Sequence, residues 1–282
     1  MPQQVLVTGA SSVLIQKVCA NLLKNDYHFT GVSRAQQNIA PNIYSDWVSV
    51  DLSSQINLID FSKYKTIIHA AAFTHAFSFE AYKKINVDIT KELVTNSKKY
   101  GVENFIFISS RAAVNNGGWY SETKLLAEKI VLEIYPNAII IRPSEIYGGT
   151  KQEGIDALIQ KIKTNKLVFY PSEIEDKMYP IQLNDATKYI AEIINNNRSG
   201  VYTVNGPEGF IMLQLIHHLA NIFNKKIIAI PIPQFVLSII CFLQQFLKLK
   251  MGVYPDQLKR LKAKKENSTP PGYVRTITKV FA

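Results

Sequence analysis

In the first half of the chain, short runs of apolar and β-branched residues alternate with longer stretches in which apolar residues recur at the helical period. The longer stretches predict helices at Val13–Leu23, Phe79–Lys98 and Tyr120–Ile134. The short runs predict strands at Gln4–Val7, Phe29–Val32, Trp47–Val50, Thr66–His69, Asn104–Ile108 and Ala138–Ile141. This alternation is typical of a parallel sheet that is covered by helices on both faces.

After Arg142 the pattern changes to longer connections, more prolines and mixed helix and strand signals. We therefore expect an α/β fold made of two parts. Residues 1–150 are expected to form a Rossmann-type, doubly wound parallel sheet. Residues 151–282 are expected to form a smaller C-terminal α/β lobe that is interleaved with the first part.

The composition is that of a soluble globular protein. The chain has 282 residues, of which 47% are hydrophobic, so it can bury a full core. Its N-terminus lacks the basic, then apolar, then small-residue pattern of a signal peptide. The two cysteines, Cys19 and Cys241, lie in apolar helical patterns. These features favour a reducing cytoplasm.

The formal net charge of +10 is spread along the chain, and the densest basic run is Lys259–Lys265. We interpret this run as a solvated helix face, with an anionic partner, either a membrane surface or a phosphorylated substrate, as the alternative. No nucleic-acid motif and no metal-ligand spacing is present, so neither nucleic acid nor a metal is expected. His69, His75 and the helix-start residue Asp185 are therefore expected to be structural.

The stretch PIPQFVLSIICFLQQFLKLKMG, which contains the predicted helix Phe235–Leu249, is apolar over about one membrane thickness, but polar residues interrupt it and prolines lie at its start. We expect a helix packed on the smaller lobe. Contact with a membrane surface, since lysines follow the apolar residues, and contact between two copies in a homodimer are the alternatives.

The first strand-to-helix junction reads VLVTGASSVLIQKV, where a doubly wound fold places a phosphate at a helix N-terminus. Gly9 begins the tight turn. Ser12 and Ile15 stand where the usual glycine fingerprint has its other two glycines. Serine can cap the helix or bond a phosphate. A branched side chain at position 15 would lower the free energy of unfolding by about 1 to 3 kcal/mol if the helix lay as close to the strand as a glycine there would allow.

Tyr120 precedes Lys124 by four residues at the start of a predicted amphipathic helix, so the two side chains share one face. An adjacent ammonium would lower the pKa of the phenol and allow proton exchange with a substrate hydroxyl or carbonyl. Such pairs also arise by chance. A second pair begins at Tyr147, but two glycines follow it and argue against a helix there. The helical context therefore makes Tyr120, and not Tyr147, the candidate.

Several motifs then fall in one order: TGASSVL, VDL at Val50–Leu52, IIHAAA, INV, FIFISS, YSETK and IIIRPSEIYGG. Together they resemble the extended short-chain dehydrogenase/reductase family, in particular its NAD-dependent epimerase/dehydratase group, which acts mostly on nucleotide sugars. The resemblance spans residues 3–225. It implies an NAD(P)-binding first part and a substrate-binding second lobe.

The resemblance also implies roles for individual residues. Tyr120 would transfer the proton, and Lys124 would hold the nicotinamide ribose and lower the pKa of Tyr120. The substrate oxygen would be bound by Ser110 or, in a second alignment of SSRAAV, by Arg111, and we favour Ser110. The cofactor would contact Gly9, Ser11, Ser12, Val13, Arg34, Asp51, Leu52, Ala70, Ala71, Asn86, Lys124 and Pro143. Arg111 and Tyr147 would contact the substrate.

The expected function is that of an NAD(P)-dependent oxidoreductase or epimerase acting on a nucleotide-diphosphate sugar. A ketoreductase with a similar substrate is one alternative. The other is an NAD(P)-binding protein without turnover, suggested by Ser12, Ile15 and a loop between Ser110 and Tyr120 that is short for this family.

The predicted second strand ends in GVSR, which bears on the choice of cofactor. Ser33 stands where a carboxylate would bind the ribose 2′-hydroxyl, and Arg34 next to it can pair with a 2′-phosphate. NADPH should therefore bind at least as tightly as NADH when both are titrated at one salt concentration. NADH binding tighter by about tenfold, or about 1.4 kcal/mol, would contradict this prediction.

Overall fold

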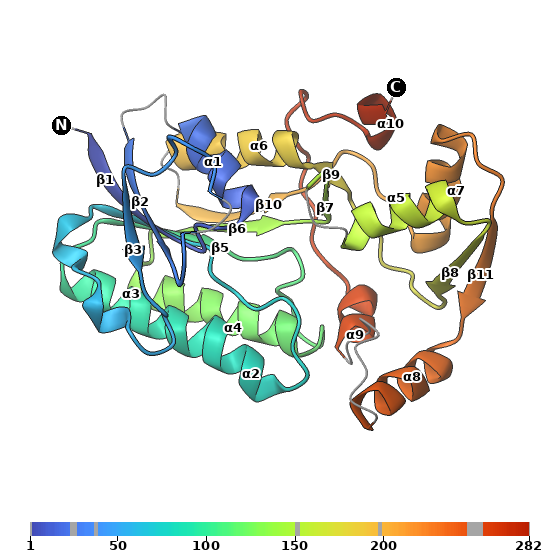
Figure 1. The fold of residues 1–282 in the computed structure, drawn as a ribbon, viewed down its shortest axis with the longest axis horizontal. Helices are drawn as coiled ribbons and strands as arrows, with labels where there is room; N and C mark the ends of the chain where they lie inside the picture. The colour runs from blue at the N-terminus through green and yellow to red at the C-terminus, as the bar shows by residue number, and fades with distance from the viewer. Residues whose placement is uncertain are drawn as a thin grey trace.

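A seven-stranded parallel sheet forms the centre of the computed structural model, which describes residues 2–22, 27–36, 39–149, 153–196, 199–246 and 256–281 (Figure 1). The strand order is β10-β6-β5-β4-β1-β2-β3, and each neighbouring pair is parallel. The strands are β1 (Gln3–Thr8), β2 (Tyr27–Ser33), β3 (Asp46–Ser49), β4 (Thr66–His69), β5 (Asn104–Ile108), β6 (Ile139–Pro143) and β10 (Gly200–Val204). The predicted doubly wound fold is confirmed.

Helices cover both faces of the sheet (Figure 1). α1 (Val13–Leu22) and α6 (Leu183–Asn195) lie on one face, and α2 (Phe79–Lys83), α3 (Ile89–Lys99) and α4 (Trp119–Ile134) lie on the other. A π-helical turn, Lys84–Asp88, joins α2 to α3. The helix predicted at Phe79–Lys98 is therefore continuous, but its middle turn is wound as a π-helix. Residue 23, the predicted end of the first helix, lies outside the described residues.

The alternation of side chains along β1 divides the core into two layers. Val5 and Val7 pack with Ile15 and Cys19 of α1, whereas Leu6 packs with Leu93 and the other apolar residues beneath the opposite face. Because both faces are buried, the central strands are continuous apolar runs. Two 3₁₀ turns, Ile56–Leu58 and Phe61–Lys63, complete the second layer.

The second lobe is built on two short parallel pairs, β8 (Leu167–Pro171) with β11 (Ile228–Ile232) and β7 (Ile146–Tyr147) with β9 (Ile181–Gln182). Its helices are α5 (Gly154–Thr164), α7 (Met212–Ile222), α8 (Gln234–Phe246), α9 (Gln257–Lys262) and α10 (Ile277–Phe281). α6 and β10 follow residue 150 but belong to the large sheet, so residues 151–282 contribute to both parts.

α8 buries only part of its apolar surface. Leu237 and Cys241 are buried, whereas Phe235 and Ile239 are exposed. One face of this helix thus packs on the lobe as predicted, whereas the other face is exposed. The last residues of the predicted helix, 247–249, lie outside the described part. Among the described residues, no helix is long and apolar enough to cross a membrane.

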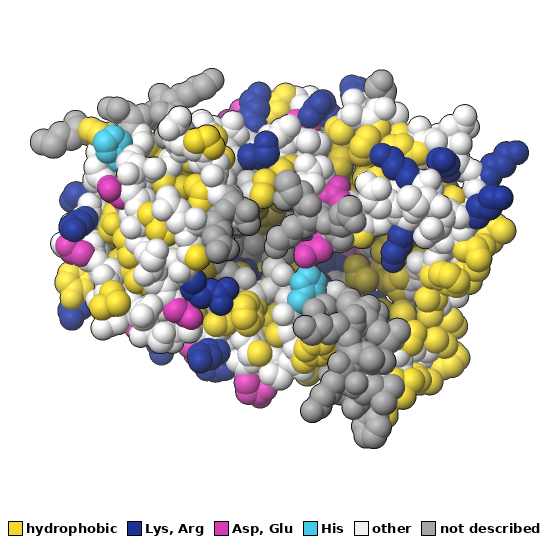
Figure 2. Space-filling view, viewed as in Figure 1, with side chains coloured by type: hydrophobic (Ala, Val, Ile, Leu, Met, Phe, Trp, Pro, Cys, Tyr) yellow, Lys and Arg dark blue, Asp and Glu magenta, His cyan; other side chains and the backbone are white. Residues whose placement is uncertain are grey.

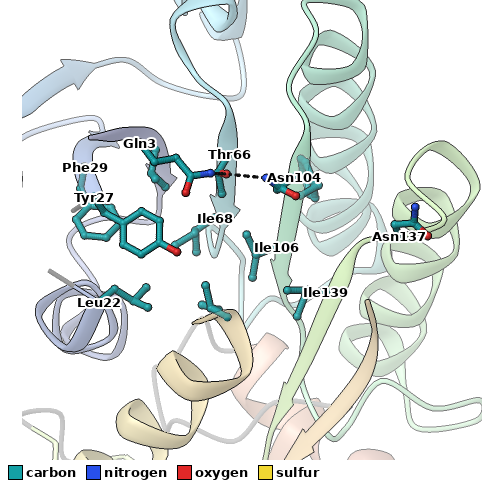
Figure 3. A pocket seen from close by; sticks show the side chains of 13 residues that line it. Gln3, Leu22, Tyr27, Phe29, Thr66, Ile68, Asn104, Ile106, Asn137 and Ile139 are labelled. Atoms are coloured by element: carbon teal, nitrogen blue, oxygen red, sulfur yellow. Dashed lines mark hydrogen bonds between the residues drawn. The ribbon is translucent and has the colours of Figure 1, made fainter. Parts of the chain in front are cut away.

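A small cavity of about 40 Å³ lies at the amino ends of β1, β4, β5 and β6 (Figure 3). Gln3 and Asn104 both donate hydrogen bonds to the Thr66 hydroxyl at its rim, over distances of 2.7 and 3.3 Å. This space suffices for a few water molecules at most. It is too small to hold a nucleotide.

Gly206 joins the two parts. It follows β10, its N–H donates to the Tyr179 carbonyl at 3.1 Å, and a Cβ atom there would lie 1.9 Å from the Pro180 carbonyl oxygen. Gly206→Ala should therefore lower the free energy of unfolding by about 1 to 3 kcal/mol or more, since the backbone must move apart. Gly272, whose added Cβ would meet nothing within 4 Å, provides the control. In urea titrations, equal stability of Gly206→Ala and Gly272→Ala would contradict this view of the joint.

Candidate active site at the carboxyl edge of the sheet

A cleft of about 630 Å³ lies where the strand order reverses, at the carboxyl ends of β1, β2, β4 and β5. This is the place at which doubly wound sheets bind their ligands. Most of the residues predicted for the cofactor and the chemistry line it. They are Gly9, Ser11, Ser12, Arg34, Asp51, Leu52, Ala70, Ala71, Ser110, Tyr120, Lys124 and Pro143.

The turn after β1 forms one wall of the cleft. Gly9 has φ of +68°, and a Cβ atom there would lie 2.8 Å from the Ala70 backbone, so this position requires glycine. The Ser12 N–H donates to the Gly9 carbonyl, and Ser11 and Ser12 are exposed at the start of α1. Ile15 is buried in the core, so α1 lies far enough from the strand to accommodate it.

The ends of β2 and β3 form the adjacent wall. The Ser33 hydroxyl donates to the Ala35 carbonyl at 2.7 Å, and Arg34 lies beside it in the cleft. Asp51 accepts hydrogen bonds from the Ser53 N–H and hydroxyl, which lower the pKa of its carboxyl group. The attraction of Arg34 contributes further to the lowered pKa. An arginine and an ionised carboxylate thus share the wall.

α4 carries Lys124 into the floor of the cleft. The ammonium donates to the Ile108 carbonyl at 2.9 Å and lies 4.1 Å from the centroid of the Phe107 ring. Burial lowers the pKa of Lys124 to about 7, although Glu128 acts in the opposite direction. Burial disfavours the charged amine because the protein interior solvates it poorly.

Tyr120 is buried on the same helix, and here the structure corrects the sequence-based expectation. Burial raises the pKa of Tyr120 instead of lowering it. Two groups offset this: the positive charge of Arg260 and a hydrogen bond with the Ser110 hydroxyl each lower the pKa. The cation that lowers the pKa of the phenol is therefore Arg260, since the Lys124 ammonium is directed to the Ile108 carbonyl at the end of β5.

The segment beginning at Asp256 brings Arg260 to this position. The Asp256 carboxylate is buried and accepts hydrogen bonds from the Tyr82 hydroxyl at 3.2 Å and the Tyr120 N–H at 3.3 Å. The Arg260 guanidinium lies 4.8 Å from the centroid of the Tyr120 ring. Sequence reasoning missed both residues because 136 positions separate Asp256 from Tyr120 and no spacing signal relates them.

The basic run Lys259–Lys265 is therefore only partly a solvated face. Arg260 covers Tyr120, and the side chain of Lys265 is 6% exposed and pairs with Asp176 at 2.8 Å. The prediction of a solvated face is wrong for these two residues, because the run folds back across both lobes.

The structure separates the two candidates in SSRAAV. Ser110 lines the cleft and bonds Tyr120. Arg111 points away from it and is buried, where it donates to Asn267 and to the Lys177 carbonyl, each at 2.6 Å, and pairs with Asp176. Of the two, only Ser110 lines the cleft, whereas Arg111 joins the two lobes.

Three other predicted contacts also lie away from the cleft lining. Asn86 is buried and holds the segment after β4, since it accepts from the Phe73 N–H and donates to the Phe73 carbonyl. Val13 is the half-buried first residue of α1. Tyr147 is buried and stacks with Phe281 of α10 at 5.9 Å between centroids.

The polar residues that we expected to be structural have partners that fit this role. His69 is buried between the hydroxyls of Thr8 and Thr90, and burial lowers its pKa to about 3, so it is neutral. Asp185 forms an ion pair and hydrogen bonds with Arg275, which fixes the C-terminal segment. Within the described ranges, no cluster of potential metal ligands is present.

The comparison with protein families identifies this architecture. The model of the NAD dependent epimerase/dehydratase family matches residues 5–205. The chain belongs to this family. The match covers the seven-stranded sheet, the glycine turn, Tyr120 and Lys124, so the resemblance noted from the motifs is confirmed.

Curated relatives within and around the family differ in their described roles. Subunit 9 of the NADH dehydrogenase [ubiquinone] 1 alpha subcomplex, mitochondrial, from Rattus norvegicus is 24% identical over 221 residues, which cover 76% of this chain and 56% of that protein. The chain thus spans about half the length of this relative. A UDP-glucose 4-epimerase from Vibrio cholerae is 22% identical over 263 residues, covering 83% of this chain and 80% of that protein.

Solved structures share the fold. A UDP-glucuronic acid 4-epimerase from Bacillus cereus, in complex with NAD, superimposes with a TM-score of 0.69 at 20% identity and covers 82% of this chain and 88% of its own. A dTDP-4-dehydrorhamnose reductase from Clostridium acetobutylicum gives a TM-score of 0.66 at 16% identity, covering 82% and 84%. At these identities the likeness concerns the fold.

The buried amine of Lys124 makes stability depend on pH. Because its pKa falls from 10.5 to about 7 on folding, the unfolded chain binds a proton that the folded chain lacks between these pH values. Stability should therefore rise with pH across this window, by up to about 1.4 kcal/mol per pH unit. The difference in unfolding free energy between wild type and Lys124→Met, measured in urea at several pH values, should show this slope. The exposed Lys129→Met should leave the slope as in the wild type; a flat difference for Lys124→Met would contradict the assignment.

Proposed function

We propose that the protein is an NAD(P)-dependent oxidoreductase or epimerase that acts on a nucleotide-diphosphate sugar. The observation that carries this proposal is the meeting of Tyr120, Ser110 and Lys124 in the cleft at the switch point of the sheet. Neighbouring structures with this fold hold NAD together with UDP-glucuronic acid or UDP-glucose, which supports both ligand classes.

The residues of the cleft fit a dinucleotide. The side-chain-free turn at Gly9 and the N-terminus of α1 suit a pyrophosphate, and Asp51 and Arg34 stand where an adenosine ribose would lie. Lys124 has one hydrogen-bond acceptor among the described residues, the Ile108 carbonyl, so its remaining N–H groups suit a ribose hydroxyl. The buried Ser109 hydroxyl, also in the cleft, is without a partner in the described part of the chain and offers a further contact.

Residues of the chain would accept and return the proton of the sugar hydroxyl. Oxidation of a sugar hydroxyl removes a hydride from carbon and a proton from oxygen; the bound nicotinamide supplies the hydride chemistry. Tyr120 would take the proton, Ser110 would hold the substrate oxygen, and Arg260 would stabilise the phenolate, because its charge lowers the pKa of Tyr120. An epimerase would return the hydride to the other face of the sugar, whereas a ketoreductase would receive its ketone from outside.

The same residues bear on the choice between NADP and NAD. Arg34 and the absence of a carboxylate at Ser33 favour NADP slightly over NAD. Cytoplasmic location, suggested by the two cysteines, stays a prediction, as does a homodimer.

A second candidate is an NAD(P)-binding protein without turnover. The specific observation in its favour is the packing of the Arg260 guanidinium on the Tyr120 ring, at 4.8 Å from its centroid, which covers part of the phenol. An activity screen with UDP-, GDP- and dTDP-sugars separates the two candidates.

Tyr120→Phe tests the proposed chemistry most cleanly because it removes only the phenolic oxygen. Turnover of a sugar nucleotide identified in the screen should fall by about 10²- to 10⁴-fold, while the fold and the affinity for the cofactor persist. The measurement is kcat together with cofactor affinity for the same preparation.

Two further variants serve as comparisons. Ser110→Ala should also lower turnover at unchanged cofactor affinity, whereas exposed Tyr100→Phe should change neither. Near wild-type turnover of Tyr120→Phe would sink the acid/base assignment.

A further inference from the structure

The largest concentration of exposed apolar side chains lies on the second lobe, far from the cleft. Figure 2 shows it as a continuous yellow area over β8, β11 and α8. On the strands it includes Leu167, Phe169 and Ile228, and on α8 it includes Phe235 and Ile239. Their exposed fractions range from 47% for Leu167 to 67% for Phe235. We call this area the apolar face.

The strand pairing explains how the face arises. β8 and β11 pair so that Leu167 lies opposite Ile228 and Phe169 opposite Ile230. The intervening Val168 is buried with Leu215 and Leu219 of α7, so alternate residues point to the opposite, open side. Both sides of this two-stranded sheet are therefore apolar, although, among the described residues, helices of the lobe cover only one of them.

α8 extends the same face. Phe235, Ile239 and Leu243 recur at helical spacing and are exposed, while Leu237 and Cys241 on the other side are buried. The lobe covers one apolar side of this helix. An exposed apolar patch such as its other side marks a site of contact with a second apolar surface. Its described residues, Gln234–Phe246, include no charged side chain.

The charge around the face identifies the kind of surface that it fits. Within the described residues 157–172 and 209–246, which build it, there is no aspartate or glutamate. The nearest acidic residue along the chain is exposed Glu173 after β8, which accepts a hydrogen bond from Gln234 at the start of α8 and pairs with Lys262 at 4.0 Å.

Exposed lysines lie beside the strand ends: Lys166 before β8, and Lys225 and Lys226 before β11. Lys163 lies instead over the Phe223 and Phe281 rings on the covered side. Figure 2 shows basic side chains beside the yellow area at this end of the lobe. A large apolar area flanked by lysines matches a bilayer whose headgroups are anionic.

We propose that the apolar face docks the protein on the surface of an anionic phospholipid bilayer, with α8 lying in the plane of the headgroups. Phe235, Ile239 and Phe169 insert among the acyl chains, and the lysines contact lipid phosphates. The cleft opens elsewhere on the molecule, so docking leaves the dinucleotide site accessible. The proposal is independent of the proposed reaction.

Cosedimentation of the full chain with vesicles tests the docking. The wild type should bind vesicles of mixed phosphatidylcholine and phosphatidylglycerol and should bind pure phosphatidylcholine much more weakly, with binding reduced by added salt. The double variant Phe235→Ser with Ile239→Ser should lower the partition coefficient by at least about tenfold, since each buried apolar side chain favours the bound state.

A matched control replaces two equally exposed apolar residues elsewhere, Leu58→Ser with Val201→Ser, and should bind as the wild type does. Charge reversal supplies a second, independent test that spares the core. Lys225→Glu with Lys226→Glu should weaken binding to the anionic vesicles only, whereas Lys98→Glu with Lys99→Glu, an exposed pair on α3, should not.

Two outcomes would overturn the proposal. One is wild-type protein that stays in the supernatant with anionic vesicles. The other is a dimer in analytical ultracentrifugation that Phe235→Ser with Ile239→Ser dissociates, together with vesicle binding unchanged by either pair of variants; the face would then be a contact between two copies of the chain. Unchanged dinucleotide affinity in each variant confirms that the fold is intact.

Discussion

A buried ammonium group, that of Lys124, is the constraint around which the site is arranged. It lies beneath the cleft at the junction of α4 with β5, and its hydrogen bond to the Ile108 carbonyl fixes the helix against the strand that carries Ser109 and Ser110. An interior position disfavours the charged amine, and a ribose hydroxyl would add a hydrogen-bond partner. The same residue therefore links the sheet, the expected ligand and the position of Tyr120 on the first turn of its helix.

The second organising feature is the return of the C-terminal segment to the first part of the molecule. Asp256 bonds the start of α4, Arg260 lies on Tyr120, and Arg111 holds Asn267 near the end of β5. Residues of the C-terminal segment thus act, together with Ser110, on the electrostatics at the phenol. Because Arg260 lowers the pKa of Tyr120 while burial raises it, the reactivity of the tyrosine depends on how this segment sits.

The sequence predicted the sheet well because local signals determine it. The apolar strands, the helical periods and the turn at Gly9 each depend on residues that are close together in the sequence. Tyr120 and Lys124 are likewise only one helical turn apart. Arg260 and Asp256 were missed because their role depends on tertiary contacts with residues far away in the chain. The pKa of Tyr120 was mispredicted for the same reason: helical spacing gives which residues are near, whereas burial and the direction of the Lys124 ammonium depend on the packing of α4 against β5. The exposure of α8 likewise depends on which of its two apolar sides the lobe covers.

Equilibrium binding of NADH and NADPH to Ser12→Asp tests most directly the central claim, that a dinucleotide pyrophosphate lies at the N-terminus of α1. Ser12 is exposed, and aspartate is also a good residue before a helix, so stability should be unchanged or slightly higher. A carboxylate next to the pyrophosphate should weaken both cofactors by about tenfold or more, whereas the neutral Ser12→Asn should bind as the wild type does. Equal affinity in Ser12→Asp and Ser12→Asn would contradict this placement of the cofactor.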